Sequence, residues 1–431
     1  MSSPRALFIH LHRWVGLSIA AFLFMSGITG AIVSWDHELD GWLNPDLFEA
    51  TSEGPVKSAL ELAALAEAAD HRVWSTFVYL NVEVDHAYEV YIFPKVDPET
   101  GESYAVDYNQ VFMDPVTGEI LGRRLWGAVE FTRANLMPFI YKLHYNLHLP
   151  DPWGMWLMGG IACLWTLDCF VGFYLTLPVR RRPDPTRALS VGRALARGWW
   201  ARWKPAWLVK WQGSSYRINF DLHRAFGLWF WAFLFTLAVS SASLNLDTEV
   251  AKPLVSLFSS FTPTPFDTRV AVPFNQPIYP KLTYPEIIEK ARADGLARGW
   301  DEPPGAIYYA PHYGTYSVYM FHPGDEHGTT GGVGPAMLYY DGLDGRPIGS
   351  LTPWAGTAGD IFLQVQFPLH SGRIAGLPGR IIVSLSGIAV ALLAVTGVII
   401  WWKKHCAHLK SLKARASDRE RFPKTHSKYA G

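Results

Sequence analysis

The chain has 431 residues, of which 49% are hydrophobic and 14% aromatic, and its formal net charge at pH 7 is zero. This composition is aromatic-rich for a soluble protein and favours a lipid bilayer as the solvent, while nothing in it indicates a nucleic-acid partner. Three cysteines form no CxxC pair, so they predict neither a disulfide framework nor a zinc site; they are Cys163, Cys169 and Cys406.

Four stretches are long and apolar enough to span a bilayer, and they predict four transmembrane helices. They lie within residues 1–35, 153–177, 223–246 and 381–402. The first could be mistaken for a signal peptide, but it is full-length and no Ala-x-Ala-like cleavage site follows it. We therefore expect it to be retained as an anchor.

The orientation of the spans is predicted from the distribution of Lys and Arg. Residues 178–220 hold ten basic residues against one acid, and the tail after residue 402 holds nine against two. Residues 36–152 hold twenty acids and seven basic residues, and residues 247–380 hold thirteen and nine. Since positive charge stays inside, both termini (the tail being 403–431) and the 178–222 loop are expected in the cytoplasm. The segments 36–152 and 247–380 then lie outside the membrane, in the periplasm if the cell is Gram-negative.

The two outer segments show the same succession of predicted elements. The first has a helix over 58–70, strands over 88–93 and 105–108, and a turn at 114–118 that leads into 119–122. The second has a helix over 284–298, strands over 316–321 and 336–340, and a matching turn at 341–349. Each outer segment is therefore predicted to be an α+β unit.

Equivalent residues of the two halves recur at similar offsets. The offset is 211 residues from His12 to His223 and 226 residues from His144 to His370. Differences of this size are what loop insertions produce, so the chain is predicted to be a two-fold internal repeat. The first and third helices run in the same direction, which relates the halves by an axis along the membrane normal.

Two of the repeated histidines stand just before apolar helices. His12 is followed four positions later by Gly16, and His223 is followed in the same way by Gly227. Residues four apart share a helix face, so each glycine leaves room beside its histidine for a flat macrocycle. We expect this pair at the cytoplasmic side.

A second pair is expected at the outer ends of the second and fourth helices, where His144 and His370 lie. Facing helices of a four-helix bundle can hold a cofactor in the core, and a haem b takes one histidine from each side. The predicted iron ligands are thus His12 with His223 and His144 with His370. His148, four residues after His144, is the reserve ligand because it shares the same predicted helix face.

Other polar residues near the predicted spans have open roles. Arg13 and Arg224 could neutralise haem propionates or simply anchor their helices at the cytoplasmic surface. Asp168 is the one acid well inside a predicted span, where it could move protons or hydrogen-bond to Thr236 or Ser240. Histidines at membrane ends can also simply meet lipid headgroups or cap helices, which remains an alternative to ligation.

The ordered set of motifs resembles the PepSY-associated transmembrane family, which includes bacterial inner-membrane siderophore ferric reductases. The motifs are 12–17 (HRWVGL), 26–30 (SGITG), Leu143-His144, 222–224 (LHR), 227–228 (GL), 369–372 (LHSG), Gly376 and 395–397 (VTG). The chain departs from the family pattern at Ser240-Ser241, where other helices carry Thr-Gly, and at His148, where an aliphatic residue is usual.

The resemblance implies PepSY-like outer units, two haems b and electron transfer to a periplasmic acceptor such as a ferric siderophore. We therefore expect a membrane α-helical protein with four transmembrane helices and two α+β PepSY-like units that acts as a ferric reductase. Its electron donor would be quinol or a cytoplasmic reductase. The alternatives are a non-catalytic protein that binds a peptide or protein partner, and a haem-independent transporter that uses Asp168.

Overall fold

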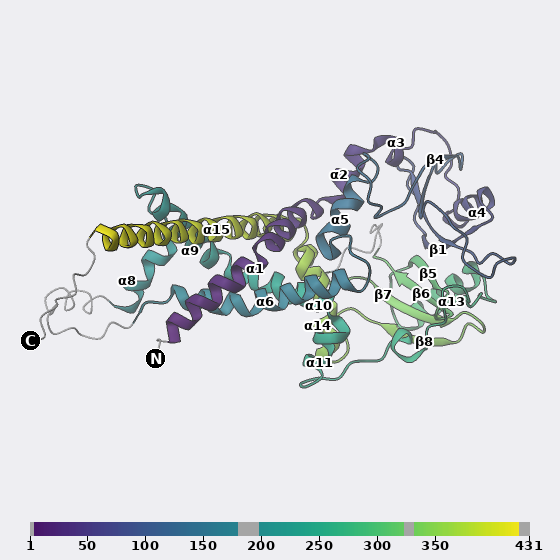
Figure 1. Cartoon of the computed structure of the whole chain (residues 1–431). Helices are drawn as coiled ribbons and strands as arrows, with labels where there is room; N and C mark the ends of the chain where they lie inside the picture. Colours follow the sequence, from purple (N-terminus) through teal and green to yellow (C-terminus); the bar gives the residue numbers. More distant parts are fainter. Residues whose placement is uncertain (1–3, 180–197, 323–331, 422–431) are drawn as a thin grey trace, which may run out of the picture. The chain divides into compact units, whose positions relative to one another are not determined.

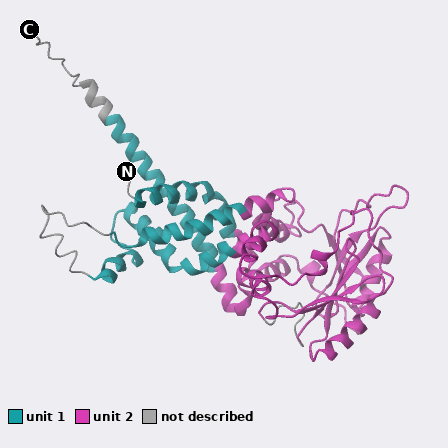
Figure 2. Ribbon diagram, turned by 90° about the horizontal axis from the view of Figure 1, so that it is seen from below, with its two compact units in different colours: residues 1–28, 160–239, 385–431 teal, residues 29–159, 240–384 magenta. Residues whose placement is uncertain are grey.

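The computed structural model describes residues 4–179, 198–322 and 332–421. These residues form two compact units, which Figure 2 distinguishes by colour. Unit 1 contains residues 1–28, 160–239 and 385–431, and unit 2 contains residues 29–159 and 240–384. The boundary between them falls within four helices, so each of these helices contributes residues to both units. Most of the basic residues in the predicted 178–222 loop belong to 180–197, outside the described residues.

Three helices in the described part of the chain are each long and apolar enough to cross a membrane. They are α1 (Pro4–Val33), α6 (Trp153–Thr176) and α15 (Gly376–Arg421) (Figure 1). Within unit 1, α1 and α15 approach closely at Gly27, where a Cβ atom would lie 2.5 Å from the carbonyl oxygen of Gly387. A side chain at position 27 would therefore push these two helices apart.

The fourth predicted span is a bent pair of helices. A single helix was predicted over 223–246, but α9 (Ser215–Trp229) and α10 (Trp231–Asn245) meet at an angle of 69°. The indole N–H of Trp229 donates to the Trp207 carbonyl, while that of Trp231 donates to the Cys169 carbonyl. The two tryptophans on either side of the bend thus hydrogen-bond to different elements. Counted as one span, the pair is a fourth candidate.

Short helices connect the longer elements. In unit 1 these are α8 (Trp199–Trp203) and the 3-10 turn Lys204–Trp207, where Trp203 packs with Leu228 of α9. In unit 2 they are α2 (Asp36–Leu43), α3 (Pro45–Phe48), α5 (Leu136–Asn146), the π turn Asp247–Ala251, α11 (Lys252–Val255), α12 (Pro265–Thr268), α14 (Ala358–Ser371) and the 3-10 turn Arg373–Ala375.

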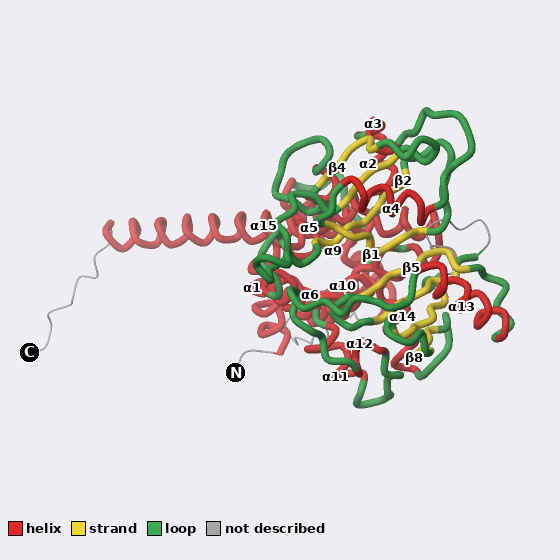
Figure 3. The backbone as a smooth tube through the Cα atoms, turned by 90° about the vertical axis from the view of Figure 1, so that its right-hand side faces the viewer, coloured by secondary structure: helices red, strands yellow, loops and turns green. Residues whose placement is uncertain are grey.

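Unit 2 is built on one antiparallel sheet with the strand order β4-β3-β2-β1-β5-β6-β7-β8 (Figure 3). Its strands are β1 (Val73–Tyr79), β2 (Tyr88–Pro94), β3 (Gln110–Met113), β4 (Ile120–Arg124), β5 (Pro304–Ala310), β6 (Thr315–Met320), β7 (Ala336–Asp341) and β8 (Pro347–Leu351). The two outer segments meet where β1 pairs with β5, with Val78 opposite Ile307. The strands of the two predicted α+β units therefore form one continuous sheet.

Two helices cover one face of this sheet and share its core. Helix α4 (Ala59–Ala69) packs on β1 and β2, and α13 (Tyr284–Ala297) packs on β5 and β6. Leu62, Val78, Ile287 and Ile307 are all buried in the common core. The N-termini of both helices lie where the sequence predicts them, since the Ser58 hydroxyl accepts from the Glu61 N–H and Thr283 begins a capping box.

The two predicted turns are confirmed and have the same hydrogen bonds. The Asp114 carboxylate accepts from the N–H groups two and three residues later, and the Asp341 carboxylate does the same. Gly118 and Gly345 follow with φ of 77° and 68°, a backbone conformation that favours glycine. Each turn leads into the last strand of its outer segment.

The strand predictions were wrong at two places. Residues 105–108 form no strand, and β3 begins at Gln110, while the Tyr108 hydroxyl donates to the Asp70 carboxylate. The sequence also failed to reveal β1 and β5, the two central strands. In β1 a register shift between Ser75 and Phe77 interrupts the alternation of buried and exposed residues that identifies a strand, and β5 is buried along nearly its whole length, so it shows no alternation.

Candidate functional site

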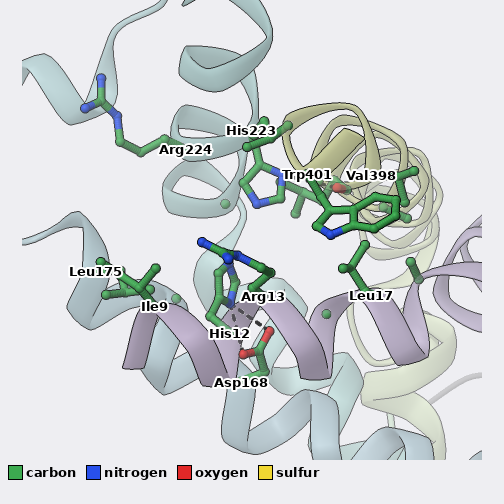
Figure 4. A pocket seen from close by; sticks show the side chains of 18 of the residues that line it. Ile9, His12, Arg13, Leu17, Asp168, Leu175, His223, Arg224, Val398 and Trp401 are labelled. Atoms are coloured by element: carbon green, nitrogen blue, oxygen red, sulfur yellow. Dashed lines mark hydrogen bonds and ion pairs between the residues drawn. The ribbon is translucent and has the colours of Figure 1, made fainter. Parts of the chain in front are cut away.

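The first histidine pair, His12 of α1 and His223 of α9, lies within unit 1. The two imidazole rings point toward one another, and their centroids are 6.1 Å apart with an angle of 59° between the planes (Figure 4). The fold thus brings together two residues 211 positions apart in the sequence.

Each ring of the first pair is held through its Nδ1 atom. The His12 Nδ1 lies 2.9 Å from both carboxylate oxygens of Asp168. The His223 Nδ1 lies 3.1 Å from the Leu393 carbonyl oxygen and 3.0 Å from the Thr396 hydroxyl. A carboxylate and a carbonyl can only accept, so the hydrogen of each ring is on Nδ1. The lone pair is then on Nε2, the nitrogen that can bind a metal.

A cavity of about 720 Å³ adjoins this pair, and mostly apolar side chains line it. Gly16 and Gly227 both lie in its wall. A Cβ on Gly16 would meet no atom within 4 Å, and one on Gly227 would meet only Leu393, at 3.8 Å. The absent side chains therefore leave open volume beside His12 and His223. Cavities that hold cofactors and other small ligands have volumes of about 300–1,000 Å³.

The two arginines beside the pair have different surroundings. The Arg224 guanidinium donates to the Asp221 carboxylate at 2.9 Å and to the Pro205 carbonyl at 2.6 Å, and the Asp221 side chain is fully buried. Figure 4 shows Arg224 directed away from His223, whereas Arg13 extends into the space between His12 and His223. Arg224 thus shares the Asp221 carboxylate with Arg217. Arg13 is one of several cationic side chains in the wall of the cavity, together with Arg5 and Lys404.

The second histidine pair, His144 and His370, lies within unit 2. Its ring centroids are 6.0 Å apart with an angle of 50° between the planes, close to the geometry of the first pair. The prediction put these histidines at the ends of membrane-spanning helices, but His144 belongs to α5 and His370 to α14. Both are separate helices that precede α6 and α15.

Hydroxyl groups hold the Nδ1 atoms of the second pair. The Thr29 hydroxyl lies 3.0 Å from the His144 Nδ1, and the Ser240 hydroxyl lies 3.0 Å from the His370 Nδ1. Ser241 is also within reach of His370, at 3.5 Å. The Ser240-Ser241 pair thus supplies on α10 the hydroxyl that Thr29 supplies on α1.

His148 does not share a helix face with His144, so that prediction was wrong. Helix α5 ends at Asn146, and His148 has a φ of 55°. Its ring stacks on Phe139 at 4.4 Å, and its Nε2–H donates to the Phe139 carbonyl at 2.9 Å. The Nε2 atom of the reserve ligand is thus directed to Phe139 of α5 and not to His370.

Glycines on other helices lie beside three of the rings, and at two of them, Gly30 and Gly397, an added Cβ would come closer than ordinary contact. A Cβ would lie 2.8 Å from the His144 Cε1 at Gly30, 3.2 Å from the His223 Cε1 at Gly397 and 3.5 Å from the His12 Cε1 at Gly172. Gly30 and Gly397 directly follow the threonines that bind the same rings. The signal was present as a Thr-Gly dipeptide in the first and last spans, whose role the sequence alone did not reveal.

Asp168 has a different partner from the two that were predicted. It binds His12, while the Thr236 hydroxyl donates to the Ala232 carbonyl and the Ser240 hydroxyl contacts His370. The side chain of Asp168 is 12% exposed. The acid singled out by its position inside a span is therefore part of the first histidine site.

Residues 9–404 match the sequence model of the PepSY-associated TM region. The chain belongs to the PepSY-associated TM family. It is a membrane protein of that family, as the sequence motifs predicted, and the matched region includes both histidine pairs. No curated protein matches the chain significantly.

Within the described residues, neither histidine pair of this PepSY-associated TM protein belongs to a larger group of side chains that could hold a metal ion. Among the described residues, no three His, Cys, Asp or Glu side chains lie close enough to hold a metal ion by themselves.

Proposed function

We propose that this PepSY-associated TM protein is a dihaem b oxidoreductase of the bacterial inner membrane. It would pass electrons to a ferric siderophore in the periplasm and so release Fe(II). The observation that carries the proposal is the equal spacing of the two histidine pairs, with centroids 6.1 and 6.0 Å apart.

This spacing suits a metal bound between the two rings of a pair. A metal–imidazole nitrogen bond is about 2 Å long, so two such bonds and half of each ring require a centroid separation of about 6 Å. A group that brings its own in-plane ligands, as a haem does, needs only two protein ligands. The fit is supported further by the open cavity beside Gly16 and Gly227.

Two haems would be held by the histidine pairs through their Nε2 atoms. One pair is His12 with His223, and the other is His144 with His370. A bound haem supplies a one-electron exchange between Fe(III) and Fe(II). The chain's own contribution is to fix the four rings through Nδ1, to exclude water with apolar side chains and to place Arg13 toward an anionic group such as a propionate.

The architecture that goes with this function is a four-helix bundle with a two-fold repeat. The helices are α1, α6, the bent pair α9 and α10, and α15. In support, α4 precedes β1 as α13 precedes β5, and His144 and His370 are both followed by an apolar helix. The repeat would explain why one pair uses α1 and α9 and the other uses α5 and α14.

The distribution of Lys and Arg assigns the termini to the cytoplasm and the sheet to the periplasm. The hydrocarbon core is about 30 Å thick, so sites on both sides of it shorten each electron transfer. Electrons would enter at His12 and His223 from quinol or a cytoplasmic reductase and leave at His144 and His370. Siderophore oxygens hold Fe(III) far more tightly than Fe(II), and reduction therefore frees the iron.

The first test is the absorption spectrum of the full chain purified in detergent. We expect a Soret band, sharp α bands on reduction, and two haems per chain by the pyridine assay. His12→Ala and His370→Ala should each leave one haem, and the double variant should leave none. A colourless protein without haem would overturn the proposal.

The acceptor is tested separately with the reduced protein under anaerobic conditions. Addition of a ferric hydroxamate siderophore should reoxidise the α bands and produce Fe(II) that a ferrous chelator captures. Gallium(III) bound to the same siderophore is the matched control, since it has a similar size and charge but no accessible reduced state. Equal reoxidation by both complexes would exclude ferric reduction as the reaction.

A further inference from the structure

The groups that hold the four Nδ1 atoms differ in charge between the two pairs. His12 is held by the carboxylate of Asp168, at 2.9 Å to each oxygen. The other rings are held by the hydroxyls of Thr396, Thr29 and Ser240, with a backbone carbonyl added at His223. The first pair therefore receives a full negative charge that the hydroxyl groups do not supply.

The surroundings of Asp168 preserve the effect of this charge. The side chain is only 12% exposed, and its one ion pair among the described residues is with His12. Charges in an apolar environment are weakly screened, so the carboxylate acts strongly on the ring and on anything bound to it. The Thr236 hydroxyl, which the sequence suggested as a partner of Asp168, donates instead to the Ala232 carbonyl.

A carboxylate that accepts the Nδ1–H bond changes the opposite side of the same ring. It increases the basicity of Nε2 and fixes the ring orientation, an arrangement common among metal-binding histidines. A more basic ligand together with a nearby negative charge stabilises Fe(III) relative to Fe(II). The iron held by His12 and His223 should then lose its electron more readily than the iron held by His144 and His370.

We propose that Asp168 is a positioning residue that keeps the reduction potential of the first pair's haem below that of the second. An electron would leave the first iron, which is oxidised, and reduce the second, so that transfer in this direction is favourable. This inference rests on the proposed function, because it needs a haem at each pair. The inference gives electron transfer a favoured direction, from the first haem to the second, which the two histidine pairs alone do not specify.

The test is a potentiometric titration of the purified full chain, with Asp168→Asn as the variant. The amide keeps the shape and an acceptor oxygen but removes the charge. Both haems should remain, and the lower of the two midpoint potentials should rise. At a fixed poise, the ferric-to-ferrous ratio of that haem should fall at least tenfold, which is a shift of about 59 mV for a one-electron couple. The electron paramagnetic resonance signal of the same haem should change.

A second variant and a control make the result specific. Asp168→Ser gives His12 a hydroxyl partner like those of the other rings, and it should also raise the lower potential. Thr29→Val removes the hydroxyl at His144 and should leave the lower potential unchanged.

The outcomes separate the inference from the proposed function. If both Asp168 variants retain two haems with unchanged potentials, the inference is overturned while the dihaem function stands. If both variants lose one haem, Asp168 is a structural support and the tuning role is rejected. A wild-type protein without haem overturns the proposed function itself.

Discussion

Gly30 and the ring of His144 face each other in unit 2, and the His144 Cε1 lies 2.8 Å from where a Cβ on residue 30 would be. Real Cβ atoms essentially never come this close to another heavy atom. The glycine is therefore needed for the ring to reach its place beside His370 and the Thr29 hydroxyl.

Gly30→Ala should displace the His144 ring and reduce the haem content from two per chain to one, measured by the pyridine assay. Gly160→Ala is the matched control, because a Cβ there meets nothing within 4 Å, and it should retain both haems. If Gly30→Ala also retains both haems with unchanged spectra, the close approach is not required.

His144 and His148 should differ sharply in their contribution to haem binding. His144→Ala removes a ring that faces His370 at 6.0 Å and should leave a single haem. His148→Ala removes a ring whose Nε2 donates to the Phe139 carbonyl, and both haems should remain. The difference is read from the reduced-minus-oxidised spectrum, and loss of a haem from His148→Ala alone would reverse the assignment.

The buried ion pair between Arg124 and Asp40 should be the most sensitive charged contact of unit 2. Arg124 donates to Asp40 at 2.7 Å and to Gln110 at 2.7 Å, and its side chain is 4% exposed. Arg124→Met leaves the Asp40 charge buried without its cation and should lower the free energy of unfolding by about 3–5 kcal/mol.

The control for this prediction is the exposed pair Arg133 and Asp46, whose side chains are 58% and 61% exposed. Arg133→Met should cost only about 0–1 kcal/mol, because water and salt screen such pairs. Denaturant unfolding of both variants in the same detergent gives the comparison. If the free energy of unfolding fell by a similar amount in the two variants, burial of the ion pair would not determine how much the lost cation destabilises the protein.

Asp70 should make the stability of the sheet depend on pH. The Arg72 guanidinium, which donates to the Asp70 carboxylate, holds the pKa of that carboxyl well below its ordinary value. A carboxyl whose pKa is lower in the folded state than in the unfolded state stabilises the fold above the unfolded pKa of about 3.9 and loses this contribution as the pH falls further.

Asp70→Asn should therefore lower the melting temperature at pH 6 and lower it progressively less as the pH falls below 4. The β-sheet signal in circular dichroism is used to follow the thermal unfolding of wild type and variant at each pH. A difference between wild type and variant that stays constant down to pH 3 would show that the charge of Asp70 does not stabilise the fold.

Local patterns were sufficient for a large part of the fold. The apolar spans, the caps of α4 and α13, and the turns at Asp114 and Asp341 are each determined by residues within a few positions of one another. The spacing of His12 to Gly16 and of His223 to Gly227 likewise needs only the geometry of one helix. Features of this kind can be read from sequence because their physical cause is local.

The sequence alone determined that this protein is a membrane protein with repeated histidines before apolar helices. Only the tertiary structure decided that β1 joins β5, that α9 and α10 bend at Phe230, and that His148 turns back onto Phe139. It also decided that Asp168 binds His12, although the two are 156 positions apart. Each of these depends on contacts between distant segments, whose partners no local pattern of residues specifies.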